Sequence, residues 1–363
     1  MVKSSIAIIG AGILGSAIAA ELATDNYSVN VFTDSEKAST ATSNSFGWIN
    51  AHSPEKPHHF QMRLESMRLW KELKAIHPAL PIKRITAIDW DMLQDEIASV
   101  HRLYSEQNHS TELLKNSELK TAFPDVQWNA ECAIVSTNDM VAIPEQIAEF
   151  FHALASARGA TFHSNQTIDM LSSNDDGITL VWGEENQTFD HVVIAAGTGS
   201  AALLKLFGYE LPMTNRTGAL FRSEPQSTRL NYLISAPDFH CWQLPDGSLI
   251  AGTAQAGSDL SKSMEEVRQQ LSNTLQELVP DFENIAFTSH TLGTRPEPED
   301  GMPVIDVLGN KQNLHIAVMH SGITLAPFVA KAVAQHIKTG RQHEKVKPYH
   351  LDRFQPEQEK IAV

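Results

Sequence analysis

The first twenty residues hold the pattern that most limits the fold of this chain. An apolar run at residues 6–9 is followed at once by Gly10, Gly12 and Gly15, and then by small residues at positions 16–22. Four consecutive apolar residues before a glycine turn are typical of a strand that is buried on both faces in a parallel sheet. The spacing G-x-G-x-x-G at the start of the expected helix is typical of dinucleotide-binding folds.

Each glycine of this motif has its own physical reason. Gly10 permits a tight turn, Gly12 lets a diphosphate approach the backbone, and Gly15 lets the helix pack closely on the strand. The N-terminus of the helix offers unpaired N–H groups and a partial positive charge, which suit a diphosphate. A second apolar strand at residues 28–32 completes the context that the motif requires.

A secretory signal peptide is the alternative interpretation of this stretch, because residues 6–20 are apolar and end in small side chains. Only Lys3 supplies positive charge there, and three spaced glycines make a poor helical apolar segment. We therefore interpret residues 6–20 as part of the fold.

Composition and charge exclude several classes of protein. The 363 residues suffice for a large core and two domains. The net charge of −15 argues against a nucleic acid as partner, because its phosphates would be repelled. No apolar run reaches the length of a membrane span. Two cysteines, Cys132 and Cys241, are too few for a disulfide framework or a zinc site, so a cytoplasmic location is expected.

Four histidines in the middle of the chain lie among polar residues and are expected at the surface. No two of them pair as metal ligands, so no metal is expected. They are His58, His59, His101 and His109.

Thr33 and Asp34 end the second strand. Dinucleotide-binding folds place an acid here to accept hydrogen bonds from the ribose hydroxyls. Asp34 is the acid at hand, but the usual position is occupied by Thr33. Capping of the next turn by Asp34 is the alternative.

The loop at residues 39–52 is rich in hydroxyl and amide side chains and then becomes apolar. Such a loop can surround a cofactor, or it can be an ordinary polar turn. The segment T-S-N-S-F-G-W-I at residues 42–49, taken together with the glycine motif, resembles the FAD-dependent D-amino-acid oxidase superfamily and in particular its glycine oxidase and sarcosine oxidase branch. The resemblance covers nearly the whole chain and implies FAD rather than NAD.

The resemblance also implies a fold of the α/β class. A discontinuous Rossmann-type FAD-binding domain is expected at residues 1–85, 138–210 and 290–363. An α+β substrate domain on a mainly antiparallel sheet is expected at residues 86–137 and 211–289. Residues up to about 127 look α-helical in this second domain, and the segment after Gly340 is expected to be a mobile polar tail.

The family resemblance assigns the cofactor contacts to four parts of the chain beyond the glycine motif. The loop at 42–49 would contact the diphosphate and the isoalloxazine, and Ile168 would hold adenine through its backbone. Ala196 and Gly197 would form a second contact, for which a structural left-handed turn is the alternative. The helix that begins at Gly322 would stabilise the negative charge of reduced flavin. The expected cofactor residues are Gly10, Gly12, Ile13, Leu14, Gly15, Thr33, Asp34, Thr42, Ser43, Asn44, Ser45, Gly47, Trp48, Ile49, Ile168, Ala196, Gly197, Gly322, Ile323, Thr324 and Leu325.

The blocks L-G-T-R-P at 292–296 and D-G-M-P at 300–303 match a family signature in which Arg295 would clamp a substrate carboxylate through two hydrogen bonds. Pairing with Glu297 or Glu299 is the structural alternative for this arginine. His240 and Trp242 precede a hairpin turn at residues 245–247, where the family has residues that face the substrate. An exposed strand position is the alternative for His240.

His52 and His320 are further candidates, which would tune the flavin or oxygen. His320 stands where glycine oxidases often carry a second arginine, which weakens the case for a small free amino acid. Sarcosine oxidases attach flavin through a cysteine before the last block, whereas Cys241 lies too far back. Non-covalent FAD is therefore expected.

The function implied is oxidation of the C–N bond of an amino acid or secondary amine to an imine, by hydride transfer to flavin N5. The cofactor carries this chemistry, and the protein positions the substrate. Oxidation of a 2-hydroxy acid, hydroxylation with NAD(P)H, and a flavin-containing subunit that needs a partner protein are the alternatives. The sequence does not determine the oligomeric state.

Overall fold

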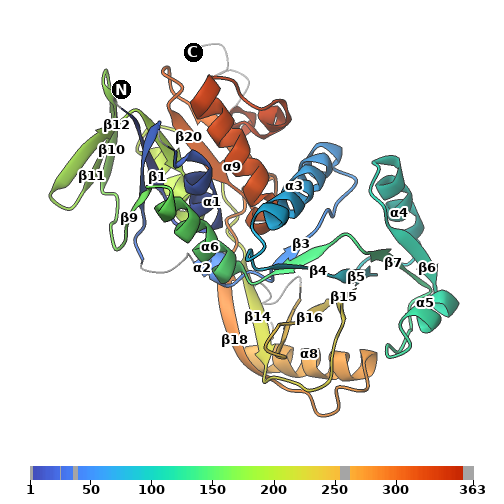
Figure 1. The fold of residues 1–363 in the computed structure, drawn as a ribbon. Coiled ribbons are helices and arrows are strands. Elements are labelled where there is room, and N and C mark those ends of the chain that lie inside the picture. Colours follow the sequence, from blue (N-terminus) through green and yellow to red (C-terminus); the bar gives the residue numbers. More distant parts are fainter. Residues whose placement is uncertain (1–2, 25, 36–39, 254–261, 355–363) are drawn as a thin grey trace.

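The computed structural model describes residues 3–24, 26–35, 40–253 and 262–354. Two large sheets organise the chain, one in the upper part of Figure 1 and one in the lower part. The described part of the chain thus has the expected α/β architecture, with a mainly parallel sheet joined to a mainly antiparallel one.

The upper sheet has six strands in the order β19-β20-β13-β1-β2-β9. Its pairs are parallel except for β19 with β20. The strands are β1 (Ser4–Ile9), β2 (Tyr27–Phe32), β9 (Thr161–His163), β13 (His191–Ile194), β19 (Val304–Leu308) and β20 (Leu314–Val318).

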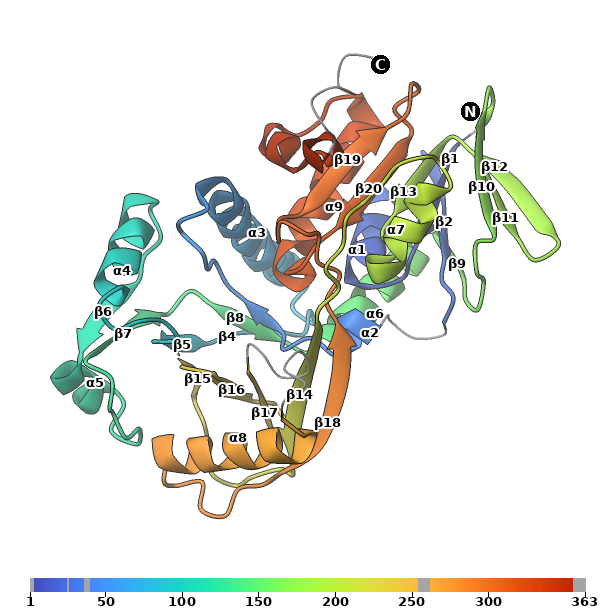
Figure 2. The same ribbon diagram turned by 180° about the vertical axis from the view of Figure 1, so that it is seen from behind.

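Alternation along β1 explains why its sequence is apolar on consecutive residues. Ile6 and Ile8 pack on the face that carries α1 (Ile13–Leu22) and α9 (Gly322–Thr339). Ala7 and Ile9 pack on the opposite face, against a three-stranded sheet and α7 (Ser200–Lys205). That small sheet consists of β10 (Met170–Asn174), β11 (Gly177–Trp182) and β12 (Glu185–Phe189). The opposite side of the molecule is seen in Figure 2, where α7 lies beside β13.

Further helices surround α1 and α9. The helix α6 (Pro144–Ala157) packs on α1, and α3 (Pro57–Ile76) packs on α9. Trp70 of α3 is fully buried, and its indole N–H donates to the carbonyl groups of Ile323 and Thr324 in the first turn of α9. The helix α3 therefore holds the beginning of α9 in place.

The lower sheet has eight strands in the order β18-β14-β17-β16-β15-β5-β7-β6, with β15 and β5 as its one parallel pair. Its strands are β5 (Thr86–Asp89), β6 (Glu112–Lys115), β7 (Cys132–Ser136), β14 (Thr217–Ser223), β15 (Tyr232–Ala236), β16 (Phe239–Gln243), β17 (Leu249–Gly252) and β18 (Phe287–Thr294).

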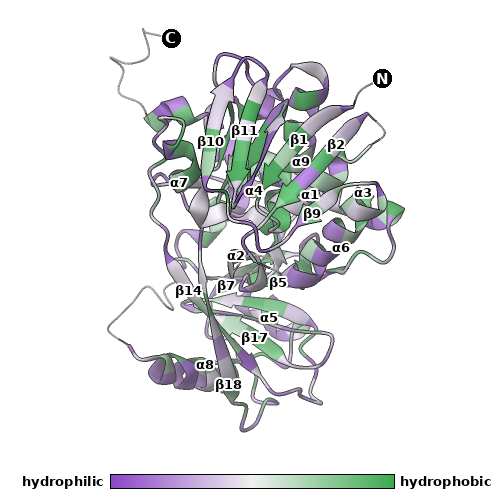
Figure 3. Cartoon of the chain, turned by 90° about the vertical axis from the view of Figure 1, so that its left-hand side faces the viewer, coloured by the Kyte–Doolittle hydropathy of each residue, from purple (hydrophilic) through white to green (hydrophobic). Residues whose placement is uncertain are grey.

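The helix α8 (Met264–Leu278) covers one face of the lower sheet. The hydroxyl of Ser263 accepts a hydrogen bond from the N–H of Glu266, and the carboxylate of Glu266 accepts one from the N–H of Ser263. This capping box satisfies N–H groups at the helix start. Figure 3 shows the hydrophilic residues of α8 at the edge of the molecule, whereas β1 and β11 are largely hydrophobic.

The remaining elements join the two sheets or extend the lower one. A small sheet has the order β3-β8-β4, and it lies between the two large sheets in Figure 1. These elements are α2 (Thr40–Ser43), β3 (Trp48–Ile49), β4 (Ile82–Arg84), α4 (Ile97–Glu106), α5 (Asn116–Ala122), β8 (Met140–Ala142), and the 3-10 turns η1 (Gly197–Gly199), η2 (Glu344–Tyr349) and η3 (Leu351–Phe354).

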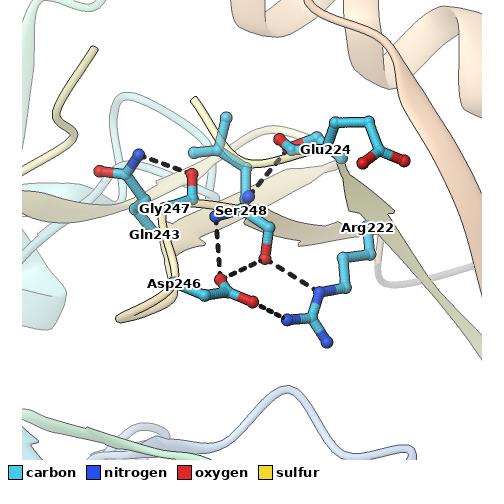
Figure 4. A network of polar contacts seen from close by, with 8 residues as sticks. Arg222, Glu224, Gln243, Asp246, Gly247 and Ser248 are labelled. Carbon is cyan, nitrogen blue, oxygen red and sulfur yellow. Dashed lines mark hydrogen bonds and ion pairs between the residues drawn. The ribbon is translucent and has the colours of Figure 1, made fainter. Parts of the chain in front are cut away.

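The predicted hairpin at residues 240–253 is confirmed as β16 and β17, and its end is held by a polar network (Figure 4). Asp246 accepts hydrogen bonds from the N–H and hydroxyl of Ser248, and it pairs with Arg222 of β14. The amide of Gln243 donates to the carbonyl of Gly247. These contacts fix β16, and therefore His240, relative to β14.

Two predictions about the fold are wrong. Residues 86–127 are not all helical, because β5 and β6 add strands of only four residues that helical spacing concealed. The described part of the tail, residues 341–354, forms η2 and η3 and packs through Val346, Tyr349 and Leu351. Residues 355–363 lie outside the described part of the chain.

The boundaries proposed for the two domains stay a prediction. In the described parts of the chain, each helix is too short or too polar to cross a membrane.

His59 and His109 are buried, contrary to the surface location expected for them, because they lie on the inner side of α3 and against Tyr104. Neither ring nitrogen of His59 has a hydrogen-bond partner among the described residues. Burial, with the nearby charge of Arg63, lowers the pKa of His59 to about 3. A buried polar group without a partner destabilises a fold, by about 1–3 kcal/mol.

We expect His59→Leu to stabilise the protein by about 1 kcal/mol at pH 7, and by more at pH 5. The folded chain keeps His59 neutral while the unfolded chain protonates it below pH about 6.5, so the wild type loses stability as the pH falls through this range. Denaturant unfolding at both pH values measures the difference. His58→Leu changes the neighbouring exposed histidine and serves as the control. An equal or smaller gain at pH 5 would contradict the account.

Candidate active site

A cavity of about 310 Å³ lies where the two large sheets meet. The upper part contributes the first residues of α1 and α9, and the lower part contributes β14, β16 and the end of β18. The loop that precedes β3 forms another wall. Residues from five distant parts of the sequence therefore surround one space.

Two helix N-termini converge on this cavity, and both suit negatively charged or polar groups of a ligand. Gly12 and Ser321 are their N-cap residues, neither of which makes a side-chain capping bond. Neither helix has an acid in its first turn. The hydroxyl of Thr42 accepts a hydrogen bond from the N–H of Ile13, at 3.1 Å, which ties the loop to the start of α1.

The glycines of the motif make the close approach possible. A Cβ at Gly10, whose φ is +109°, would lie 2.4 Å from the carbonyl oxygen of Ala195 at the end of β13. A Cβ at Gly15 would lie 1.8 Å from the oxygen of Gly10. Gly47, with φ +79°, comes as close to Ala142, at 2.1 Å. These distances leave no room for a side chain, so the residues form a cradle that fits a dinucleotide.

The structure brings most of the predicted cofactor residues to the cavity wall. Those that line it are Gly12, Ile13, Leu14, Thr42, Asn44, Ser45, Gly47, Trp48, Gly197, Gly322, Ile323 and Thr324. Those that do not line it are Gly10, Gly15, Thr33, Asp34, Ser43, Ile49, Ile168, Ala196 and Leu325.

The second group has identifiable positions outside the wall. Gly10 and Gly15 form the turn behind the helix start, and Ile49 and Leu325 are fully buried in the core. Asp34 is exposed just past the end of β2, while the N–H and carbonyl of Thr33 bond with His163 and Gln166. The remaining three members of the group adjoin wall residues or the core beneath them.

Arg295 lines the cavity directly after β18. Its guanidinium has no hydrogen bond or ion pair with any described residue, because Glu297 binds Arg216 through two hydrogen bonds of 2.7 and 2.9 Å. The guanidinium lies flat on β14, where a Cβ at Gly218 would be 3.1 Å from its Nη2 atom. Arg295 is thus available to a ligand anion.

His240 also lines the cavity, with its ring 4.4 Å from that of Phe46. A Cβ at Gly252 on the paired strand would lie 2.7 Å from its Nε2 atom, so the glycine makes room for the imidazole. Burial, reinforced by the charge of Arg295, lowers the pKa of His240 to about 4. The side chain is therefore neutral at neutral pH.

Trp242 faces the same side of β16 as His240 but does not line this cavity. Its indole N–H donates to the carbonyl of Phe46, at 3.0 Å, and it is almost fully buried. Trp242 therefore supports the loop that carries Phe46 and lines a separate cavity of about 460 Å³.

His320 and His52 lie at different depths. His320 lines the cavity beside Ser321, and desolvation together with the charge of Arg295 lowers its pKa to about 4. His52 lies behind the indole of Trp48, at 4.3 Å between ring centres, and 3.7 Å separates its Nδ1 from the carboxylate of Asp89. Trp48 thus stands between His52 and the main cavity.

The sequence analysis missed Arg63 and Asn50, both of which line the cavity. Arg63 lies on α3 within an apolar helical stripe, where a charge carries no local signal of function. Asn50 follows β3 and accepts hydrogen bonds from Arg63 at its backbone oxygen and at Oδ1. Only the packing of α3 against the loop brings these residues to the site.

The comparison with protein families gives a match to the FAD dependent oxidoreductase (DAO) model over residues 5–336. The chain belongs to this family. Its cofactor is therefore FAD, and the suspected resemblance to the D-amino-acid oxidase superfamily is confirmed. The cradle and the two uncapped helix ends fit this cofactor.

Relatives extend over nearly the full length of the chain. A glycine oxidase from Bacillus licheniformis is 25% identical and covers 91% of this chain and 92% of its own. An opine oxidase subunit from Rhizobium meliloti is 22% identical and covers 99% and 100%. L-proline dehydrogenase from P.horikoshii has a similar fold, with a TM-score of 0.86, 21% identity and coverage of 97% and 98%.

Gly252→Ala tests the position of His240. The added methyl group would displace the imidazole end, so we expect kcat/KM to fall about tenfold to a hundredfold while bound FAD and Tm change little. Gly199→Ala is the control, since its Cβ would make an ordinary contact of 3.9 Å. Unchanged kcat/KM in Gly252→Ala would show that the position of His240 does not matter for turnover.

Proposed function

We propose that this FAD-dependent oxidoreductase oxidises the C–N bond of an amino acid or secondary amine to an imine, which water then hydrolyses. The observation that carries the proposal is the guanidinium of Arg295, which lines the FAD cavity and has no partner among the described residues. A planar guanidinium binds a carboxylate through two parallel hydrogen bonds. The names glycine oxidase and L-proline dehydrogenase support an amino-acid substrate.

Bound FAD supplies the oxidising group that accepts a hydride from the substrate carbon. Arg295 orients the carboxylate, and His240 and His320 form neutral walls around the substrate. No carboxylate occurs among the described residues that line the cavity. The substrate amine is therefore not held as an ammonium ion by an acid, which favours the neutral amine that hydride loss requires.

Anaerobic mixing with amino acids, N-methyl amino acids and N-carboxyalkyl amino acids tests the function directly. We expect one of these classes to bleach the flavin absorbance, because reduction removes the yellow colour. Failure of every amine would contradict C–N oxidation. Bleaching by a 2-hydroxy acid, or by NAD(P)H without amine, would then favour the other oxidoreductase chemistries.

Arg295→Ala should lower kcat/KM for the bleaching substrate by about 2–4 kcal/mol, because the carboxylate loses its charged partner. Steady-state kinetics at matched FAD content measure the loss. Arg222→Ala removes a guanidinium from β14 that pairs with Asp246 outside the cavity, and it should leave kcat/KM unchanged. An equal effect of both substitutions would rule out carboxylate binding by Arg295.

A second candidate function is that of a flavin-containing subunit of a larger enzyme, which the relative named as a subunit of opine oxidase supports. An isolated chain that binds FAD but is bleached only after a second protein is added would favour it.

The non-covalent state of FAD is also a proposal, supported by the positions of Cys132 and Cys241, which do not line the cavity. Both are free thiols, which suits a reducing compartment such as the cytoplasm. Precipitated protein that keeps its flavin would contradict non-covalent binding.

A further inference from the structure

Arg63 carries a positive charge into the interior at the FAD cavity. It is 8% exposed and lies on α3. Its guanidinium donates to the backbone oxygen of Asn50 at 3.2 Å, to Oδ1 of Asn50 at 2.6 Å and to the hydroxyl of Ser321 at 3.2 Å. All three acceptors are neutral, and no ion pair joins Arg63 to another described residue.

A buried charge without an opposite charge beside it is costly, by several kcal/mol, so its persistence calls for an explanation. Burial lowers the pKa of Arg63 to about 10, against the opposing influence of Tyr104 and Asp139. The side chain still remains charged at neutral pH. The hydrogen bonds to neutral groups hold the guanidinium in place without cancelling its charge.

The position of this charge indicates what it meets. Arg63 contacts Ser321, the N-cap of α9, so its charge adds to the positive end of that helix. Arg63 and Arg295 carry the permanent charges among the described residues that line the cavity. Because Arg295 is proposed to bind the substrate carboxylate, the charge of Arg63 remains for the cofactor.

We propose that Arg63 is a fixed positive charge for FAD that stabilises the negative charge of the reduced flavin and so raises its reduction potential. The inference rests on FAD binding in this cavity and not on the identity of the substrate. Arg63 also joins the loop after β3 to the start of α9, so its substitution can affect packing as well as charge. The experiment must separate these two effects.

The measurement is the midpoint potential of the purified holoenzyme during anaerobic titration with dithionite and a reference dye. Arg63→Met should lower the potential by about 30 mV or more, which corresponds to a tenfold change for a two-electron couple. Arg63→Lys keeps the charge and should stay close to the wild type. Arg158→Met removes a guanidinium that bonds to Ala20 outside the cavity lining and is the control.

Asn50→Asp provides a second variant if Arg63→Met loses FAD or fails to fold. A carboxylate of the same shape beside Arg63 keeps the hydrogen bond and neutralises the charge of the pair, so the potential should again fall by about 30 mV or more. Sulfite binding to the oxidised flavin, which adds negative charge, should weaken at least tenfold in both variants.

The inference is overturned if Asn50→Asp retains FAD with an unchanged potential, or if Arg63→Met does so. It is also overturned if Arg63→Lys lowers the potential as much as Arg63→Met, because the effect would then follow packing and not charge. No substrate takes part in the titration, so failure of the proposed C–N oxidation would leave these outcomes distinct.

Discussion

The close approach of backbones at the carboxyl ends of β1 and β13 is the constraint on which the rest of the site depends. Gly10 touches the oxygen of Ala195, and Gly15 touches the oxygen of Gly10, at distances that exclude any side chain. Because parallel strands end at one edge of their sheet, the helices α1 and α9 begin at the same edge after β1 and β20. Their N–H groups then face one cavity. The FAD site is therefore a consequence of sheet topology combined with two positions that only glycine can occupy.

The lower sheet adds the chemistry that the upper sheet lacks. Alternation on β16 directs His240 toward the cavity, while Cys241 faces the core under α8. Pairing of β14 with β18 places Gly218 under the guanidinium of Arg295. Competition for acids decides the state of that guanidinium: Glu297 is bound to Arg216, so Arg295 stays available. The electrostatics of the cavity are thus positive even though the whole chain is strongly negative.

Local sequence was sufficient for elements whose pattern is strong. The glycine motif, the hairpin turn at residues 245–247 and the capping box at Ser263 each give a signal within a few residues, and the structure has the elements they predict. Short strands such as β5 and β6 lack such a signal, because four residues do not distinguish strand from helix. The tail packs for a similar reason, since the apolar residues Val346, Tyr349 and Leu351 are too widely spaced among charges to stand out.

The sequence by itself determined the α/β class, the cofactor family and most residues on the cavity wall, because a cofactor bound by backbone groups needs glycines and hydroxyl residues at fixed spacing. Tertiary structure alone decided which charges remain without a partner. Arg63 reaches the site because α3 packs on α9, and Trp242 is held away from the cavity by its bond to Phe46. These outcomes depend on contacts between residues far apart in the chain, and spacing along a sequence contains no measure of such distances.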